Sequence, residues 1–317
     1  MKFLGPLLVL IALGIASLFA GVSDLSLVTV LSGDERALLI LMESRVPRTL
    51  ALVLAGAGMA VSGTIMQMLA RNRFVEPSTA GTVESAGLGI LVALLFAPDL
   101  PVFGKMLVAT GFALLGTSLF LLILRQVPLR TPLMVPLIGI MLGGVISAMT
   151  TFIAYRADML QSLGAVMTGD FSSVLRGRYE LLWMSLGLTL AALWTADRFT
   201  VMGLGQEFAT NLGLAYGRIL TLGLVIVSVV TACVVVTVGM VPFVGLMVPN
   251  IVSIAVGDNL RRSLPLVACL GAGLVLACDI VGRIVIPPFE IPVGAILGVV
   301  GSVFFLFLIL RKRSRVA

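Results

Sequence analysis

Residues 202–218 read MGLGQEFATNLGLAYGR, a polar segment between two long apolar runs. Leu204, Phe208 and Leu212 recur every four residues, which predicts an apolar stripe along one side of a helix. Gly213 is expected to end that helix, because glycine tolerates the left-handed turn found there. The segment is too short and too polar to span a bilayer, so it is predicted to be a short amphipathic helix at the membrane surface.

Two interpretations of this helix remain open from its pattern. One face could contact its own protein while the other meets something outside it. The alternative is a surface helix that only caps the two spans on either side. Only the rest of the chain favours the first interpretation.

The composition predicts an integral membrane protein. Hydrophobic residues make up 59% of the chain, charged residues make up 11%, and the mean hydropathy is +1.17. The net charge of +6 is explained by basic residues retained in cytoplasmic loops, and nucleic-acid binding is not expected. Lys2 precedes the uncharged run 3–23, which we interpret as a first span that remains rather than a cleaved signal peptide.

Gaps between charges predict ten transmembrane spans in a single permease domain, residues 1–317. The spans lie near 4–22, 50–70, 79–97, 106–124, 131–154, 180–196, 219–239, 243–257, 264–282 and 292–310. The uncharged run 219–257 is too long for one helix, and Gly239, Pro242 and Pro249 are expected to break it. Residues 156–179 are predicted to form a short helix and turn at the outer surface.

An even number of spans places both termini on one side of the membrane. That side carries 13 lysines and arginines: Lys2, Arg71, Arg73, Arg125, Arg130, Arg198, Arg218, Arg261, Arg262, Arg311, Lys312, Arg313 and Arg315. The other side carries 8. Because basic residues are retained in the cytoplasm, both termini and the segment 202–218 are expected to face the cytoplasm.

The sequence shows no site that could supply the energy for transport. A phosphate-binding loop needs the order GxxxxGK[ST], but the one Gly-Lys pair, Gly104-Lys105, is followed by Met and lacks the earlier glycine. With no histidine, neither a hydrolase-type base nor a His/Cys metal site is supported. An ion-coupled carrier would want carboxylates deep in its spans, whereas Glu84 and Asp279 are expected near span ends. The chain is predicted to be no enzyme, with ATP used by another subunit.

Three arginines on the outer side stand out as candidates for binding another protein. Arg45 and Arg48 are three residues apart, and Pro47 is expected to help start their helix, so both can face one outer surface. Arg283 lies at the end of the ninth span. The alternative is that these arginines snorkel to lipid headgroups or pair with nearby carboxylates. The candidate carboxylates are Glu43, Asp279 and Glu290.

Five segments together carry a family resemblance. They are RVPRTLALVLAGAGMAVSGTIMQ (45–67), ARNRFVEPSTAG (70–81), MGLGQEFATNLGL (202–214), GMVPFVGLMVPNIVSIAVGDNLRRSLP (239–265) and DIVGRIVIPPFEIPVGAILGVVGSVFF (279–305). They resemble the FecCD/BtuC-type permeases of bacterial ABC importers for ferric siderophores, haem and vitamin B12. The resemblance covers nearly the whole chain and implies the all-α, ten-span, type II ABC importer permease fold.

The resemblance also implies a set of partners and sites. A second permease chain, identical or different, two ATP-binding subunits and a periplasmic or lipoprotein substrate-binding protein would assemble with this chain in the cytoplasmic membrane of a bacterium. Segment 202–214 matches the family's coupling helices, and the fifth and tenth spans match those that line the pathway. Candidate ATPase contacts are Gly205, Glu207, Phe208, Asn211, Leu212 and Gly213. Arg45, Arg48 and Arg283 match the arginines that meet acidic residues of the binding protein.

The sequence departs from the commonest family pattern at two places. The loop often written RNPL has Arg73 in place of proline, and the usual VPHI-x-R has Asn250 and Ser253 in place of histidine and arginine. With GDFSSVLRGRYELL (169–182), these departures look like a subgroup for siderophores of the petrobactin, anguibactin or vibriobactin kind. The expected cargo is therefore a ferric siderophore. The alternatives are a haem or vitamin B12 permease and, in a different class, an ion-coupled secondary transporter.

Overall fold

The computed structural model describes residues 4–21, 29, 32–127 and 133–313, and regular structure in that part of the chain is helical throughout. Five of its helices are long and apolar enough to cross a membrane, and five shorter apolar helices accompany them. Each of these ten helices overlaps one predicted span, so the expected all-α membrane fold is confirmed. Lys2, Arg130 and Arg315 of the charge count lie outside the described residues, as do residue 22 and residues 131–132 of the predicted spans.

The first half of the described chain contains α1 (Leu4–Phe19), α3 (Glu35–Ile40), the π turn η1 (Leu41–Arg45), α4 (Val46–Leu69), the short turn η2 (Ser78–Ala80), α5 (Thr82–Phe96), α6 (Val102–Gln126) and α7 (Met134–Arg156). The second half contains α8 (Leu160–Met167), α9 (Leu182–Trp194), α10 (Ala196–Gly203), α11 (Gln206–Asn211), α12 (Tyr216–Val238), α13 (Val244–Val256), α14 (Leu260–Ile284) and α15 (Val293–Arg313).

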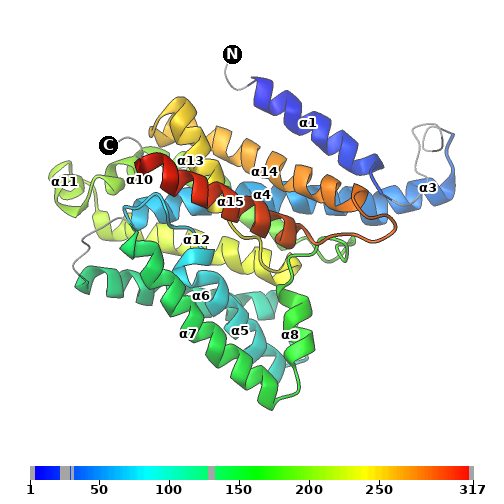
Figure 1. The fold of residues 1–317 in the computed structure, drawn as a ribbon, viewed down its shortest axis with the longest axis horizontal. Coiled ribbons are helices and arrows are strands. Elements are labelled where there is room, and N and C mark those ends of the chain that lie inside the picture. The colour runs from blue at the N-terminus through cyan, green and yellow to red at the C-terminus, as the bar shows by residue number, and fades with distance from the viewer. Residues whose placement is uncertain (1–3, 22–28, 30–31, 128–132, 314–317) are drawn as a thin grey trace.

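Helix α4 forms the centre of the bundle and packs against α9, α12, α13 and α14 (Figure 1). Its glycines allow the backbones to touch, as small residues do in lipid. A Cβ placed on Gly56 would lie 2.6 Å from the Gly271 carbonyl oxygen of α14. A Cβ placed on Gly63 would lie 2.2 Å from the Gly245 Cα of α13. The glycine spacing in this part of the sequence therefore serves packing within the chain.

The helix that contains α4 begins earlier than predicted. One continuous helical stretch runs over Glu35–Leu69, whereas the charge gaps placed the second span at 50–70. Pro47 was expected near a helix start, but the helix reaches it through the π turn η1, where the Val46 amide donates to the Leu41 carbonyl. This shift in hydrogen-bond register directly before Pro47 lets the chain accommodate a residue without an amide hydrogen.

The predicted break in the run 219–257 is confirmed, although one proline has a different role. Helix α12 ends at Gly239, which has φ +87°, and α13 begins after Phe243, which has φ +63°. Pro249 does not contribute to this break but lies inside α13. It cannot donate to the carbonyl of Gly245, four residues earlier, and the side-chain amide of Gln67 lies 3.5 Å from that oxygen.

The two ends of the bundle differ clearly. Helices α10 and α11 and the end of α15 lie at one end, and α3 lies at the other (Figure 1). Helix α1 runs from the N-terminus toward the α3 end, and α8 supplies the short helix expected within 156–179. The charge count predicts that the α10–α11 end faces the cytoplasm. We call the opposite end the outer end.

The contact between α4 and α13 gives a prediction about stability. Gly63→Ala should lower the free energy of unfolding by about 1–3 kcal/mol, because its Cβ would meet the Gly245 backbone, which cannot rotate away. Gly14→Ala in α1 is the matched control, since nothing lies within 4 Å of a Cβ there. Thermal unfolding of both purified variants in detergent measures the difference. Equal midpoints would contradict the role assigned to this contact.

Candidate functional site

The segment 202–218 includes the end of α10, the short helix α11 and the start of α12, instead of one helix. Helix α10 ends at Gly203, the chain turns at Gly205 with φ +112°, and α11 then covers Gln206–Asn211. Gly213 ends α11 as predicted, with φ +80°. The amide of Gly213 donates to the Thr210 carbonyl and that of Leu214 to the Ala209 carbonyl, which is the Schellman pattern. Both ends of α11 are therefore fixed by glycine.

The apolar side chains of this segment point away from the protein. Leu204 is 61% exposed, and Phe208 and Leu212 are each 67% exposed. Ala209 is the buried residue of α11 and faces the protein. Phe208 on α11, Leu204 before its Gly205 turn and Leu212 directly after its last residue thus present three large apolar side chains to the surroundings. Clustered exposed apolar residues of this kind mark a surface that another molecule covers.

A cleft of about 870 Å³ lies beside α11. It is lined by Arg71, Leu204, Gly205, Gln206, Glu207, Phe208, Thr210 and Asn211. Arg71 comes from the loop between α4 and α5, and a Cβ placed on Gly205 would lie 3.0 Å from its Nη1. The sequence pattern does not predict Arg71 as part of this site, because only folding brings residue 71 to residue 205.

The departures from the common family pattern meet in one place. The side-chain amide of Asn250 donates to the Arg73 carbonyl at 2.9 Å, and the Arg73 guanidinium pairs with Asp258 at 2.5 Å. The Ser253 hydroxyl donates to the other oxygen of Asp258. These residues line a cavity of about 220 Å³ that also touches α10 through Thr200. The substituted positions thus form one connected contact beside α10.

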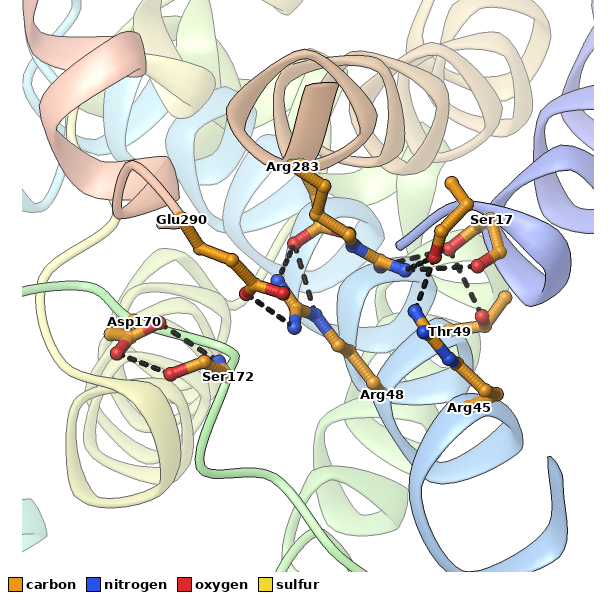
Figure 2. Close-up of polar contacts among 10 residues, drawn as sticks. Ser17, Arg45, Arg48, Thr49, Asp170, Ser172, Arg283 and Glu290 are labelled. Atoms are coloured by element: carbon orange, nitrogen blue, oxygen red, sulfur yellow. Dashed lines mark hydrogen bonds and ion pairs between the residues drawn. The ribbon is translucent and has the colours of Figure 1, made fainter. Parts of the chain in front are cut away.

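The three arginines predicted to dock a partner lie together at the outer end, where they are engaged inside the protein (Figure 2). Their exposed fractions are 8% for Arg45, 7% for Arg48 and 3% for Arg283. Arg48 donates to Asp279 at 2.7 Å and to Glu290 at 2.7 Å. Arg283 also pairs with Asp279, from the preceding turn of α14.

Helix α1 completes this arginine network. Arg283 donates to the carbonyl oxygens of Ser17 and Ala20 at 3.0 Å and 2.9 Å, and Arg45 also donates to Ala20. The Ser17 hydroxyl lies 3.1 Å from that of Thr49 on α4. The network therefore joins α1, the start of α4 and the end of α14.

The alternative of pairing with carboxylates describes Arg48 and Arg283 in this structure. Glu43, the third candidate carboxylate, instead pairs with Arg176 at 3.3 Å. Docking through the three arginines stays a prediction. It would require incoming carboxylates to add to pairs that already exist or to replace them.

Glu84 lies deeper in the bundle than its place in the chain predicts. It is in the first turn of α5, yet a Cβ placed on Gly143, midway along α7, would lie 3.3 Å from its carboxyl carbon. The loop before α5 folds inward, so this helix begins within the bundle. The depth of Glu84 therefore does not argue against an ion-coupled carrier. The class of transporter rests on other observations.

Comparisons with known proteins agree with this architecture. A petrobactin import system permease protein of Bacillus subtilis (strain 168) is 47% identical over 314 residues, covering 99% of each chain. A ferric-anguibactin transport system permease protein of Vibrio anguillarum is 42% identical over 295 residues, 93% of this chain and 94% of the relative. A solved metal-chelate type ABC transporter in an inward-facing conformation superposes with a TM-score of 0.79 at 25% identity, covering 97% and 98% of the two chains.

The helical fold and its similarity to a solved ABC transporter define an integral membrane permease of the ABC transporter class. The FecCD transport family model matches residues 8–311, which are nearly the whole chain. The chain belongs to the FecCD transport family.

The arginine network predicts a large effect from a small change. Asp279→Asn should lower the free energy of unfolding by about 3–5 kcal/mol, because it leaves Arg48 and Arg283 buried without their shared carboxylate. Glu43→Gln, which removes one partner of an exposed pair, should cost about 0–1 kcal/mol. Thermal unfolding of the two variants measures both effects. If Asp279→Asn has the same unfolding midpoint as the wild type, the two arginines do not depend on Asp279. A purely external role for them is then favoured.

Proposed function

We propose that this chain is the permease subunit through which an ABC importer moves a ferric siderophore across the cytoplasmic membrane of a bacterium. Relatives at 47% and 42% identity, over nearly the full chain, are named for petrobactin import and ferric-anguibactin transport. The departures at Arg73, Asn250 and Ser253 support the same subgroup and weigh against haem and vitamin B12 as cargo. ATP would bind to two separate subunits, because this sequence lacks a phosphate-binding loop.

The observation that carries this proposal is the exposed apolar stripe on a helix whose two ends are fixed by glycine. Phe208 and Leu212 would seat in a pocket of the ATP-binding subunit, and Glu207 and Asn211 would contact the rim of that pocket. A short, fixed helix transmits a displacement because it moves with the spans attached to it. The stripe lies at the end of the bundle opposite the arginine network, as an importer driven from the cytoplasm requires.

A second permease chain is proposed to cover α7 and α15. Both helices expose large apolar side chains, among them Ile140, Val145 and Met149 on α7 and Val299 and Val303 on α15. A hollow of about 640 Å³ along α7 is lined in part by the small residues Gly144, Ser147, Ala148 and Thr151. Small residues favour the close approach of another helix, which supports a protein partner over lipid at this position.

A substrate-binding protein is proposed to dock at the outer end, over Arg45, Arg48 and Arg283. Glu290, the partner of Arg48, has 27% of its side chain exposed, so the network reaches the surface at this residue. Acidic groups of the binding protein would join the network there. Charge complementarity of this kind governs the rate and salt sensitivity of encounter more than the final affinity.

The coupling proposal predicts an effect confined to one face. Phe208→Ala should weaken association with the ATP-binding subunit by about 1–3 kcal/mol or uncouple hydrolysis from uptake, because buried aromatic anchors dominate such interfaces. Glu207→Ala should have a smaller effect, since a charge at the rim stays partly solvated. Phe96→Ala, an exposed phenylalanine at the far end of α5, is the matched control. Full assembly and coupled uptake by Phe208→Ala would show that α11 is only a surface cap.

The function itself is tested by reconstitution. The purified permease alone should hydrolyse no ATP, and proteoliposomes that also contain its ATP-binding subunits and binding protein should accumulate ferric petrobactin only with ATP. Cobalamin and haem should not be accumulated. Uptake driven by a proton or sodium gradient without ATP would refute the class of transporter. Uptake of cobalamin but not of the siderophore would refute the cargo.

A further inference from the structure

Glu76 is a buried carboxylate that the proposed function does not use. It lies in the loop between α4 and α5, which includes Arg71 at one end, and it is 0% exposed. Its backbone amide donates to the Thr79 hydroxyl at 2.9 Å, and the Thr79 amide donates to its carbonyl at 3.1 Å. Its Oε1 also accepts a hydrogen bond from the Ser78 hydroxyl. The side chain is therefore held firmly on its own loop.

The same carboxylate reaches the start of α13. The amide of Phe243 donates to Oε1 of Glu76 at 2.7 Å. A Cβ placed on Gly245 would lie 3.1 Å from Oε2, so no side chain separates Glu76 from the first turn of the helix. Amides at a helix start lack partners within the helix, and a negative charge there is favourable. Glu76 thus ties the α4–α5 loop to the beginning of α13, inside the bundle.

The start of α13 in turn contacts α15. Phe243 has the left-handed backbone conformation, with φ +63°, and a Cβ placed on Gly301 of α15 would lie 2.3 Å from the Phe243 Cβ. The α4–α5 loop touches α15 directly as well, through the rings of Phe74 and Phe305, whose centroids are 6.1 Å apart. The position of α15 beside α13 therefore depends on where the loop holds Phe243.

We propose that Glu76 is a positioning residue for transport, which sets the place of α15 by fixing the start of α13. The inference rests on the proposed function, in which α15, the tenth predicted span, is expected to line the transport pathway. The loop that carries Glu76 begins at the cleft beside α11, so one continuous segment connects the coupling surface to α15. Removing the carboxylate charge should weaken the hold of this loop on α13 while leaving α11 unchanged.

Glu76→Gln tests the proposal because it keeps the size of the side chain and removes the charge. In the complete importer, ATP hydrolysis should persist while uptake falls about tenfold, since a charged acceptor in a buried site is lost. Glu35→Gln is the matched control, a carboxylate in the first turn of α3 that is exposed. It should leave both rates unchanged.

A second readout follows α15 without any substrate. All three native cysteines are buried, so in the detergent-solubilised monomer a cysteine introduced at Val303, on the α15 face proposed to meet the second permease chain, is the main target for a membrane-permeant maleimide. In the purified permease, Glu76→Gln should change its labelling rate about threefold, as expected for a local change in packing. Phe243→Ala should give the same change, because it removes the ring, whose Cγ and Cδ2 also lie against Gly301 of α15, while keeping the amide that donates to Glu76.

Several outcomes would overturn the proposal. Unchanged labelling in Phe243→Ala would do so, even if Glu76→Gln failed to fold. If Glu76→Gln altered labelling but left uptake normal, the position of α15 would not govern transport. If it abolished uptake but left labelling unaltered, Glu76 would not act through the position of α15. If the wild-type importer moves no siderophore, the proposed function fails, and the labelling comparison still decides whether Glu76 positions α15.

Discussion

Close backbone contact between α4 and its neighbours α13 and α14 is the constraint on which the rest of this structure depends. Within a bilayer, burial of apolar side chains gives little preference for protein over lipid, so helices associate through packing and polar contacts. Gly63 against Gly245 and Gly56 against Gly271 bring three backbones together. Only at that separation can the Gln67 side chain approach the Gly245 carbonyl and Glu76 reach the first turn of α13.

Several buried polar groups lie where helices begin, end or are interrupted. Pro249 leaves the Gly245 carbonyl without its usual donor. Glu76 accepts a hydrogen bond from the Phe243 amide at the start of α13, which has no partner within the helix. The arginine network performs a similar task at the outer end, where Arg283 donates to the last carbonyls of α1. In lipid these backbone groups have no water to bind, so each needs a partner from the protein. Glu76 and Arg283 are thus tied to backbone groups at helix ends.

The two candidate surfaces differ in how they are prepared for a partner. The α11 surface holds its helix by glycine turns and leaves its apolar side chains exposed, so a partner can bury them with little rearrangement. The arginine surface has its charges already paired. A partner there would exchange one set of ion pairs for another, which favours selectivity and reversibility over tight binding. Such a difference would suit the two proposed partners, an ATP-binding subunit that stays bound and a binding protein that docks transiently.

The sequence by itself determined the helical membrane fold, the order of the spans, the break after Gly239 and the end of α11 at Gly213. These features follow from local chemistry: charge spacing sets where a span can lie, and glycine sets where a helix turns. Tertiary structure decided that Pro249 lies within a helix, that Arg48 and Arg283 share Asp279, and that Arg71 borders α11. It also placed Glu76 beneath α13. The contacts of Arg48, Arg71 and Glu76 join residues far apart in the chain. Single-sequence patterns carry no information about which distant groups will meet.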